Sequence, residues 1–269
     1  MEQDLSSFLT ILRNEIITIL EYNHKDYCLI VFPEYMFRTT PLELVLEYIN
    51  GTLKNDLSEF SHFLIVLGTV DVPVDGNPEK YYNSALVVYK IDKDDFTIKY
   101  VPKTQVLESD IQNNVIAGTN PGAVILPLSQ TPDDSMERPK SLNVGVLVCA
   151  DLYNYGLCYD LVMRQNVDVL LVTAWTATSK GGAQRAKLIW NALCKTRTIE
   201  FAVTVAVADH LLNHANKDVG NVTNIYEGNC GYKVPIEENV YSKTNTINIS
   251  VIHDYRKYWF GKGFRPNLL

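Results

Sequence analysis

The sequence lacks the features of a disulfide-built or secreted protein. Its 269 residues include only five cysteines, an odd number, and no two of them stand in a Cys-x-x-Cys spacing. Unpaired thiols of this kind indicate a reducing compartment, so we expect a cytoplasmic protein without a disulfide framework. The acidic beginning Met-Glu-Gln-Asp also lacks the basic and apolar regions of a secretion signal.

Long apolar runs and an excess of basic residues are also absent. The longest apolar-leaning stretch, residues 167–178, is far shorter than the ~20 residues that cross a bilayer, and it contains Asp168. The 24 basic residues are outnumbered by 31 acidic ones, which gives a net charge of −7. A surface that binds nucleic acid through its phosphates needs the opposite balance. We therefore expect neither a membrane nor a nucleic-acid partner, which leaves an enzyme with a small-molecule substrate, a binding protein or an assembly subunit.

Short apolar runs that are typical of buried strands alternate with amphipathic helical stretches along the chain. This pattern predicts an α/β fold in which helices cover buried sheets. Residues 129–140 collect prolines and charged side chains between two strand-like runs, which predicts an exposed loop inside one domain that spans residues 1–269. The predicted helices are 5–20, 41–53, 157–165 and 184–198, and the predicted strands are 28–32, 63–69, 84–90, 97–101, 124–128, 143–148, 169–173 and 202–208.

Three reactive side chains stand where predicted strands end. Glu34 follows the first strand, Lys103 follows the strand at 97–101, and Cys149 follows the strand at 143–148. Ligands of α/β sheets bind beyond the carboxyl ends of strands, so the three groups could converge. A carboxylate can take the thiol proton, and an ammonium favours the thiolate and stabilises an oxyanion. Taken singly, each residue is more often a packed cysteine or a solvated charge.

Six short segments, in this order, resemble the motifs of the carbon–nitrogen hydrolase (nitrilase) superfamily. The matching segments are Val31-Phe32-Pro33-Glu34, Tyr82-Asn83-Ser84-Ala85, Tyr100-Val101-Pro102-Lys103, Gly145-Val146-Leu147-Val148-Cys149-Ala150-Asp151, Asp168-Val169-Leu170-Leu171-Val172-Thr173-Ala174-Trp175 and Arg197-Thr198-Ile199-Glu200. The resemblance covers about residues 5 to 210, and the joint order of the six segments is far more specific than any single match.

The resemblance implies a four-layer α-β-β-α sandwich of two mixed sheets and a Glu-Lys-Cys triad made of Glu34, Lys103 and Cys149. It further implies hydrolysis of a non-peptide carbon–nitrogen bond through a thioester, without a metal or an organic cofactor. The backbone N–H of Ala150 would assist Lys103 at the tetrahedral centre, and Trp175 would be structural or a wall of the pocket. Subunits of this family usually pack through helices, so a homodimer or a higher homo-oligomer is expected.

The chain departs from the family pattern in several places. Family chains usually open with a strand before the first helix, and this one opens with the helix. Residues 246–252 alternate polar and apolar side chains, so we expect them to pair at a sheet edge. The edge where the missing first strand would lie is one candidate, because an open edge exposes unpaired backbone groups. Tyr153 stands where the family often has an arginine, and Asp209-His210 where it often has an asparagine.

A second carboxylate is often found shortly after the lysine motif in this family. The chain offers Glu108 and Asp110, five and seven residues after Lys103. We favour Glu108, because its longer side chain can reach inward from a loop. A solvated acidic loop is the alternative.

Other readings compete with amide hydrolysis. The thioester could be passed to an amine in place of water, or the chain could be a catalytically silent member that binds or assembles, because a fold does not guarantee its usual function. Cys149 is followed by Ala150-Asp151, whereas nitrilases of the family usually carry Trp-Glu there, which favours an amide or carbamoyl substrate over a nitrile. His210, His214 and Cys230 are too few and too scattered for a convincing zinc site.

Overall fold

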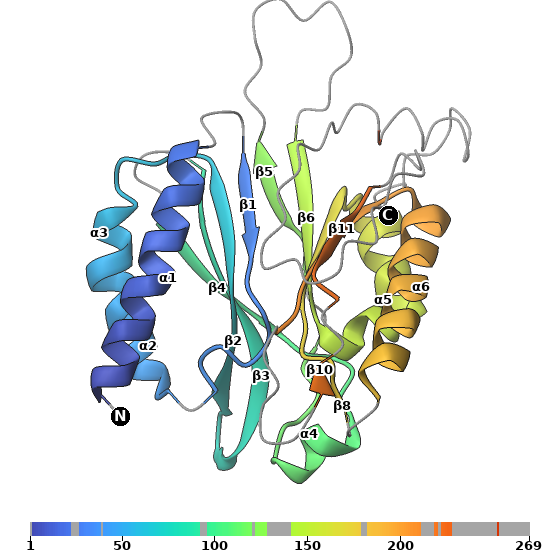
Figure 1. The fold of residues 1–269 in the computed structure, drawn as a ribbon, viewed down its shortest axis with the longest axis horizontal. Helices are drawn as coiled ribbons and strands as arrows, with labels where there is room; N and C mark the ends of the chain where they lie inside the picture. Colours follow the sequence, from blue (N-terminus) through green and yellow to red (C-terminus); the bar gives the residue numbers. More distant parts are fainter. Residues whose placement is uncertain are drawn as a thin grey trace, which may run out of the picture.

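Two sheets packed face to face form the centre of the molecule, with helices on both outer sides (Figure 1). The computed structural model describes residues 2–22, 27–38, 40–91, 96–119, 122–127, 141–178, 182–210, 218–219, 222–227 and 252. Helices α1, α2 and α3 cover the first sheet, and α5 and α6 cover the second (Figure 1). The predicted fold class, an α-β-β-α sandwich of two mixed sheets, is confirmed.

The first sheet has four strands in the order β1-β2-β3-β4. Strands β1 and β2 are parallel, whereas β2, β3 and β4 form an antiparallel meander. Its elements and their helices are α1 (Glu2–Tyr22), β1 (Cys28–Val31), α2 (Leu42–Tyr48), the π-helical turn Ile49–Leu53, α3 (Lys54–Asp56), β2 (Phe63–Val74), β3 (Asn77–Lys90), β4 (Phe96–Pro102) and α4 (Glu108–Gln112).

The second sheet has five strands in the order β11-β9-β7-β6-β5. Its three central strands β9, β7 and β6 are parallel, and the outer two are antiparallel to their neighbours. Its elements are β5 (Val124–Pro127), β6 (Ser141–Val148), the 3-10 turn Cys149–Tyr153, α5 (Tyr155–Tyr159), the π-helical turn Asp160–Arg164, β7 (Val169–Thr173), α6 (Ala183–Phe201), β9 (Thr204–Ala208) and β11 (Asn224–Tyr226), beside a two-stranded ribbon of β8 (Ala177–Thr178) and β10 (Asp218–Val219).

The side chains of β2 alternate between two hydrophobic cores. Leu64 and Val66 belong to the core shared with the second sheet, whereas Phe63, Ile65 and Leu67 belong to the core under the helices. Successive side chains of a strand point to opposite faces, so a strand that is buried on both faces must be apolar at every position. The uninterrupted run Phe63-Leu64-Ile65-Val66-Leu67 follows directly from this requirement.

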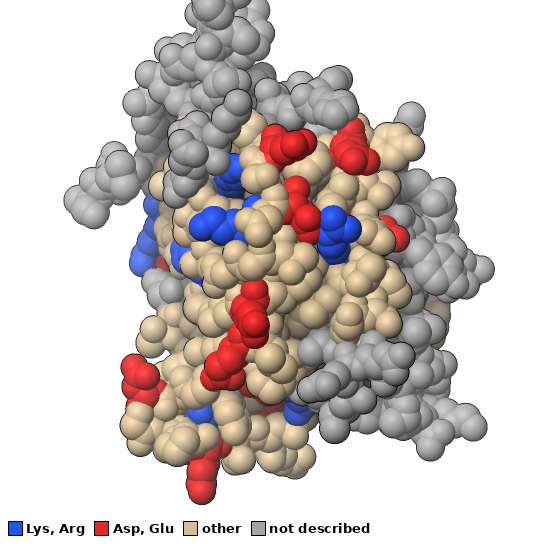
Figure 2. Space-filling model, turned by 90° about the vertical axis from the view of Figure 1, so that its left-hand side faces the viewer, with Lys and Arg blue, Asp and Glu red and all other residues tan. Residues whose placement is uncertain are grey.

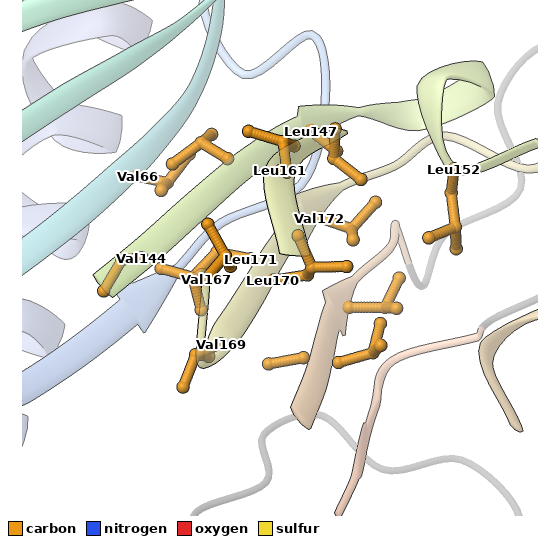
Figure 3. Close-up of a cluster of buried hydrophobic side chains, with 14 of the residues drawn as sticks. Val66, Val144, Leu147, Leu152, Leu161, Val167, Val169, Leu170, Leu171 and Val172 are labelled. Atoms are coloured by element: carbon orange, nitrogen blue, oxygen red, sulfur yellow. The ribbon is translucent and has the colours of Figure 1, made fainter. Parts of the chain in front are cut away.

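Strand β2 also contacts the second sheet across the interior. Val66 of β2, Val144 of β6 and Leu171 of β7 belong to one hydrophobic cluster (Figure 3), and all three are fully or almost fully buried. On the other side of the first sheet, Leu12 and Ile16 of α1 pack in the core under the helices. Burial of such side chains stabilises the fold by ~1.5–3 kcal/mol each, so these contacts fix the sheet-on-sheet arrangement that brings the strand ends together.

The predicted helices and strands are present, most of them with boundaries within a few residues of those expected. The exceptions are β2, which extends beyond the predicted 63–69 to Val74, and β3, which begins at Asn77 and not at 84. The predicted exposed loop, residues 129–140, lies outside the described residues, and so do residues 246–251 of the predicted edge strand. Ile252 is described, and there the strand prediction is wrong, because its backbone is helical and its side chain is buried. Among the described helices, none is long and apolar enough to span a membrane.

The outer face over α1, α2 and α3 carries acidic and basic side chains in an interspersed pattern (Figure 2). One ion pair on this side joins α1 to α3, where the Arg13 guanidinium donates to Asp56 Oδ1 at 3.0 Å. Over the described part of this face no continuous basic patch is visible, which agrees with the acidic net charge of −7.

A glycine lets the loop after β1 lie directly on β2. Gly68 has φ +90, in the left-handed region, and a Cβ there would lie 2.4 Å from the carbonyl oxygen of Pro33 and 2.6 Å from Met36 Cγ. The next residue, Thr69, accepts the backbone N–H of Tyr35 on its Oγ1 at 2.9 Å. Gly68 and Thr69 therefore hold the segment that contains Glu34.

Replacing Gly68 with alanine should destabilise the fold by at least ~2 kcal/mol more than replacing Gly76 does. Both glycines have positive φ, but a Cβ at Gly76 meets nothing within 4 Å. Gly76→Ala therefore reports the backbone strain alone, about 1 kcal/mol, and Gly68→Ala adds the collision with the Pro33–Met36 segment. Urea unfolding of both variants gives the comparison. Equal midpoints would show that the loop does not depend on this close approach.

Candidate active site

Three side chains from three strand ends lie together between the sheets. Glu34 follows β1, Lys103 follows β4, and Cys149 follows β6. Their exposed fractions are 1%, 2% and 8%, so all three are withdrawn from solvent. The structure thus brings together the three residues that the sequence singled out, in the segments that directly follow β1, β4 and β6.

The Glu34 segment is held from both sides. The backbone N–H of Glu34 donates to the Ala174 carbonyl at the end of β7 at 3.2 Å, which ties β1 to the second sheet. The His210 ring Nε2 makes a short contact with the Glu34 carbonyl oxygen. On the side chain, Oε1 accepts Asn83 Nδ2 at 2.8 Å and Lys103 Nζ at 3.1 Å. These contacts leave the carboxylate of Glu34 little freedom to turn.

Lys103 lies between two buried carboxylates. Its Nζ is 3.1 Å from Glu34 Oε1 and 3.0 Å from Asp110 Oδ2. Its backbone is fixed as well, since its N–H donates to the Asn83 carbonyl at 2.8 Å and its own carbonyl accepts from Gly118 at 2.8 Å. The backbone of Lys103 is therefore held in place, and its ammonium lies between two carboxylates that are held in place as well.

The second carboxylate is Asp110, and the sequence-based choice of Glu108 was wrong. Asp110 is 2% exposed, whereas Glu108 is exposed to solvent. Both lie in α4, but Asp110 turns back toward its start, where Oδ2 caps the Leu107 N–H at 2.8 Å. The single turn of α4 thus points Glu108 outward and Asp110 at Lys103, so the length of the side chain was the wrong criterion.

Cys149 occupies a tight turn directly after β6. Its φ is +47, which is uncommon for a residue with a side chain and typical of strained functional positions. Asp151 closes this turn, because its Oδ2 accepts the Val148 N–H at 3.1 Å. Its other oxygen accepts the backbone N–H groups of Thr104 at 2.9 Å and Gln105 at 2.6 Å. One carboxylate therefore ties the cysteine turn to the loop that follows Lys103.

Burial and neighbouring charge perturb all three groups. Burial raises the pKa of Glu34, against the opposing effects of the Lys103 charge and of a hydrogen bond from the Cys149 thiol. Burial lowers the pKa of Lys103, but Glu34, Cys149 and Asp110 outweigh it, so this pKa lies above its ordinary value. Burial and the Glu34 charge raise the pKa of Cys149 well above its usual range, although Lys103 lowers it. The thiol is therefore protonated at rest, next to a carboxylate with an increased proton affinity.

Aromatic rings border the three groups. The carbonyl oxygen of Trp175 lies 3.9 Å from Cys149 Sγ, and the Trp175 ring meets the Tyr35 ring edge to face at 5.0 Å. Ala150 follows the cysteine in the 3-10 turn and is 1% exposed. Two of the three residues that the sequence named as auxiliary, Trp175 and Ala150, thus lie next to Cys149, whereas the third, Glu108, is exposed.

Sequence reasoning did not assign roles to Tyr35, Asn83 or Asp151. Two of them carried a usable signal: Asn83 is a polar residue at the start of an apolar stretch of β3, and Asp151 lies two residues after the cysteine. Such buried polar groups need partners, which here are Glu34 and the loop after Lys103. Tyr35 carried no such signal, because nothing in the sequence indicates where its hydroxyl points.

No metal centre forms in the described part of the chain, where no group of three or more potential ligands gathers. His210 is next to the site through its contact with the Glu34 carbonyl, whereas His214 and Cys230 lie outside the described residues. The buried thiol, carboxylates and ammonium form an acid–base and nucleophile set that needs no metal for proton transfer.

Comparison with solved structures identifies the fold. A mutant of an amidase from Nesterenkonia, of the nitrilase superfamily, matches with a TM-score of 0.59 at 12% identity over 83% of this chain and 78% of that one. A CN-hydrolase superfamily protein from Xanthomonas campestris matches with a TM-score of 0.63 at 17% identity, over 92% and 88%. The glutamine-dependent NAD+ synthetase of Acinetobacter baumannii matches at 0.54 and 17%, over 83% of this chain but only 39% of that one.

No family model and no curated protein sequence matches the chain. The identities to the solved structures are low, so these matches establish the fold of the carbon–nitrogen hydrolases and not the reaction. The resemblance inferred from six short motifs is therefore confirmed for the fold.

Brief treatment with a small uncharged alkylating agent should label Cys149 before Cys28, Cys158 or Cys194. Burial raises the pKa of Cys149 as well as that of Cys28 and Cys158, which both rise to about 11, but Cys149 lies beside Glu34, which can accept its proton. Labelling of Cys149 should decrease as the pH falls through the pKa of Glu34, at a higher pH than for an ordinary carboxyl, because protonated Glu34 accepts nothing. Peptide mapping after alkylation measures both effects.

The matched pair of variants is Glu34→Gln and Glu108→Gln, which remove one carboxylate each. Glu34→Gln should slow Cys149 labelling by about tenfold or more, and Glu108→Gln should leave it unchanged, since Glu108 is exposed. Preferential labelling of another cysteine, or equal rates in the two variants, would remove Glu34 as the proton acceptor.

Proposed function

We propose that the protein is a cysteine-dependent hydrolase that cleaves a non-peptide carbon–nitrogen bond in a small amide or carbamoyl compound. Cys149 acts as the nucleophile, Glu34 as the general base and acid, and Lys103 with the Ala150 N–H as the groups that stabilise the oxyanion. The single observation that carries this proposal is the position of the Lys103 ammonium, 3.1 Å from Glu34 Oε1, in a buried site that also contains the Cys149 thiol.

The reaction follows from these positions. Glu34 takes the thiol proton while Sγ of Cys149 bonds to the carbonyl carbon, and the negative charge that develops on the carbonyl oxygen faces Lys103 and the Ala150 N–H. The carbon–nitrogen bond then breaks, and the departing amine takes the proton from Glu34. A water molecule gives a proton to Glu34 as it attacks the thioester, which releases the carboxylic acid and restores the thiol.

The raised pKa of Glu34 suits both halves of this cycle. Burial makes the carboxylate a stronger base than one in water, so it can take a proton from a thiol whose own pKa is raised. The same proton can later be delivered to an amine. Lys103 keeps its charge throughout, because its pKa lies above the ordinary value. These directions support a proton that moves between Cys149, Glu34 and the substrate while the ammonium stays in place.

The structural neighbours suggest a suitable probe. A mutant of the Nesterenkonia amidase shows covalent addition of the acetamide moiety of fluoroacetamide at its active-site cysteine. The Xanthomonas campestris protein carries an arsenic adduct in its active site. Fluoroacetamide is a small neutral amide with a leaving group, so it tests whether Cys149 accepts an amide-sized electrophile.

The test is a panel of small amides, carbamoyl compounds and nitriles, with wild type and Cys149→Ala. We expect ammonia and the corresponding acid from an amide or carbamoyl compound with wild type, and neither product with Cys149→Ala. Product that forms only when an amine acceptor is added would identify an acyltransferase. No product and no fluoroacetamide adduct would identify a catalytically silent protein and overturn the proposal.

Lys103→Arg should lower turnover by at least ~10²-fold, the effect of removing one oxyanion donor. Arginine keeps the charge but has a planar fork that cannot fit between Glu34 and Asp110 as an ammonium does. Lys99→Arg is the control, because Lys99 lies on β4, the strand that Lys103 follows, with its Nζ 3.4 Å from the Gly122 carbonyl. Turnover of the amide found in the panel is the measurement, and near-normal turnover in Lys103→Arg would exclude Lys103 from the oxyanion site.

We also propose that the enzyme is cytoplasmic and forms a homodimer or a larger homo-oligomer. The outer face of α5 and α6 supports the assembly, because it exposes large apolar side chains. The more exposed ones are Tyr155 at 52%, Leu188 at 60% and Ile199 at 52%. Leu188 and Ile199 are eleven residues apart on one helix and so share a face. Such a patch is expected to be covered by a partner.

Exchanging Ile199 for lysine should weaken this assembly without unfolding the subunit, because the side chain is exposed in the single chain. Sedimentation velocity at several concentrations should show an oligomer for wild type and a shift toward monomer for Ile199→Lys. Ile11→Lys on α1, exposed at 63% on the opposite side of the sandwich, is the matched control. A monomeric wild type, or equal sedimentation of both variants, would contradict the assembly through α5 and α6.

A further inference from the structure

The carboxylate of Asp110 is held by three donors that come from three directions. Its Oδ2 accepts the Leu107 N–H at 2.8 Å and contacts Lys103 Nζ at 3.0 Å. Its Oδ1 accepts the hydroxyl of Tyr35 at 2.9 Å. Tyr35 directly follows Glu34, so the segment that supplies one carboxylate partner of Lys103 also holds the other.

Tyr35 is itself fixed in an unusual conformation. Its φ is 60, in the left-handed region that side-chain-bearing residues rarely adopt. Its backbone N–H donates to Thr69 Oγ1 at 2.9 Å, and its ring packs against Trp175. The Arg38 guanidinium covers the ring at 4.6 Å from its centre. A strained backbone persists only where its surroundings hold it, so these contacts determine where the hydroxyl points.

We infer that Tyr35 is a positioning residue of the candidate active site, whose hydroxyl holds Asp110 so that Lys103 stays between two carboxylates with its charge available to Cys149. The consequence for turnover rests on the proposed function, whereas the effect on the thiol does not.

The charges of the site explain why one hydroxyl matters. Two carboxylates, Glu34 and Asp110, share a single buried ammonium. The hydroxyl of Tyr35 satisfies one oxygen of Asp110, so Lys103 is not required at both. Without this donor, Asp110 Oδ1 is left unpaired in a buried site, where an unmet acceptor is costly. The ammonium is then drawn toward Asp110 and away from Cys149, and the thiol loses part of the one charge that lowers its pKa.

The hydroxyl can serve as a donor throughout the accessible pH range. Burial, the charges of Glu34 and Asp110 and the hydrogen bond to Asp110 raise the pKa of Tyr35 well above its ordinary value, and only Arg38 opposes them. The phenol therefore stays protonated, and a change in the titration of Cys149 after its removal cannot come from ionisation of the tyrosine.

The experiment is a double-variant cycle of Tyr35→Phe and Asp110→Asn, read by the pH dependence of Cys149 alkylation with fluoroacetamide. Phenylalanine keeps the ring against Trp175 and Arg38 and removes only the hydroxyl. Tyr48→Phe is the matched control, since it removes a hydroxyl that donates to the Leu9 carbonyl at 3.0 Å, far along the chain from the site. Glu108→Gln is the control for loss of a carboxylate from α4.

We expect Tyr35→Phe to move the alkylation profile to higher pH and to slow alkylation about tenfold at a fixed pH on its rising limb. In the Asp110→Asn background the same exchange should add little, because the hydroxyl acts through Asp110. Both controls should keep the wild-type profile. With an amide substrate, kcat should fall while KM changes less than about twofold, since the tyrosine acts through Lys103 and not through the ground-state complex.

An unchanged profile in Tyr35→Phe, or effects of the two exchanges that simply add, would overturn the inference and leave Tyr35 as a wall of the site. If Tyr35→Phe folds poorly, p-aminophenylalanine is placed at position 35, because it keeps a hydrogen-bond donor on the same ring. This variant should show the wild-type profile. A profile that differs from wild type would also overturn the inference. Alkylation needs no turnover, so a shifted profile in a protein that hydrolyses no amide would support the inference while the proposed function fails.

Discussion

One buried ammonium shared by two buried carboxylates is the interaction on which the site depends. Lys103, Glu34 and Asp110 are each at most 2% exposed, and the two contacts of Nζ are 3.1 and 3.0 Å long. Buried charges of this kind are stable only when every partner is present, and removing one costs about 3–5 kcal/mol. The loop after β1, which carries Glu34, and the segment from Lys103 to α4 must therefore fold together. Backbone hydrogen bonds fix both segments, from Glu34 to Ala174 and from Lys103 to Asn83.

The sandwich supplies the frame for this cluster. Because β2 is apolar on both faces, the first sheet can pack on the second sheet with one face and on the helices with the other, which places the ends of β1, β4 and β6 together. Asp151 then links the cysteine turn to the loop after Lys103, and Gly68 lets the Glu34 segment lie against β2. The reactive groups are thus positioned by backbone contacts, with little left to flexible side chains.

Short-range patterns predicted sheets covered by helices and the three strand-end residues, whereas the two-sheet sandwich and the triad were implied by the resemblance to the carbon–nitrogen hydrolase motifs. Continuous apolar runs indicate doubly buried strands, and a polar residue directly after such a run must lie at a sheet edge. The sequence favoured Glu108 over Asp110 by side-chain length, but the outcome depends on which residue of a one-turn helix faces Lys103 and caps Leu107. The role of Tyr35 was equally hidden, since its left-handed backbone and the direction of its hydroxyl are set by Thr69 and Asp110, which are 34 and 75 residues away.

The proposed reaction cleaves a carbon–nitrogen bond through a thioester on Cys149. The most direct test of this reaction is to mix the wild-type protein with an amide that it hydrolyses and to quench the mixture in acid at short times. Peptide mapping by mass spectrometry then locates any acyl group on the protein. A thioester mechanism predicts an acyl group on the peptide that contains Cys149. This group should form before the free acid appears and should be lost as the acid accumulates. An acyl group on another residue, or acid that forms with no acyl-protein at any time, would contradict it.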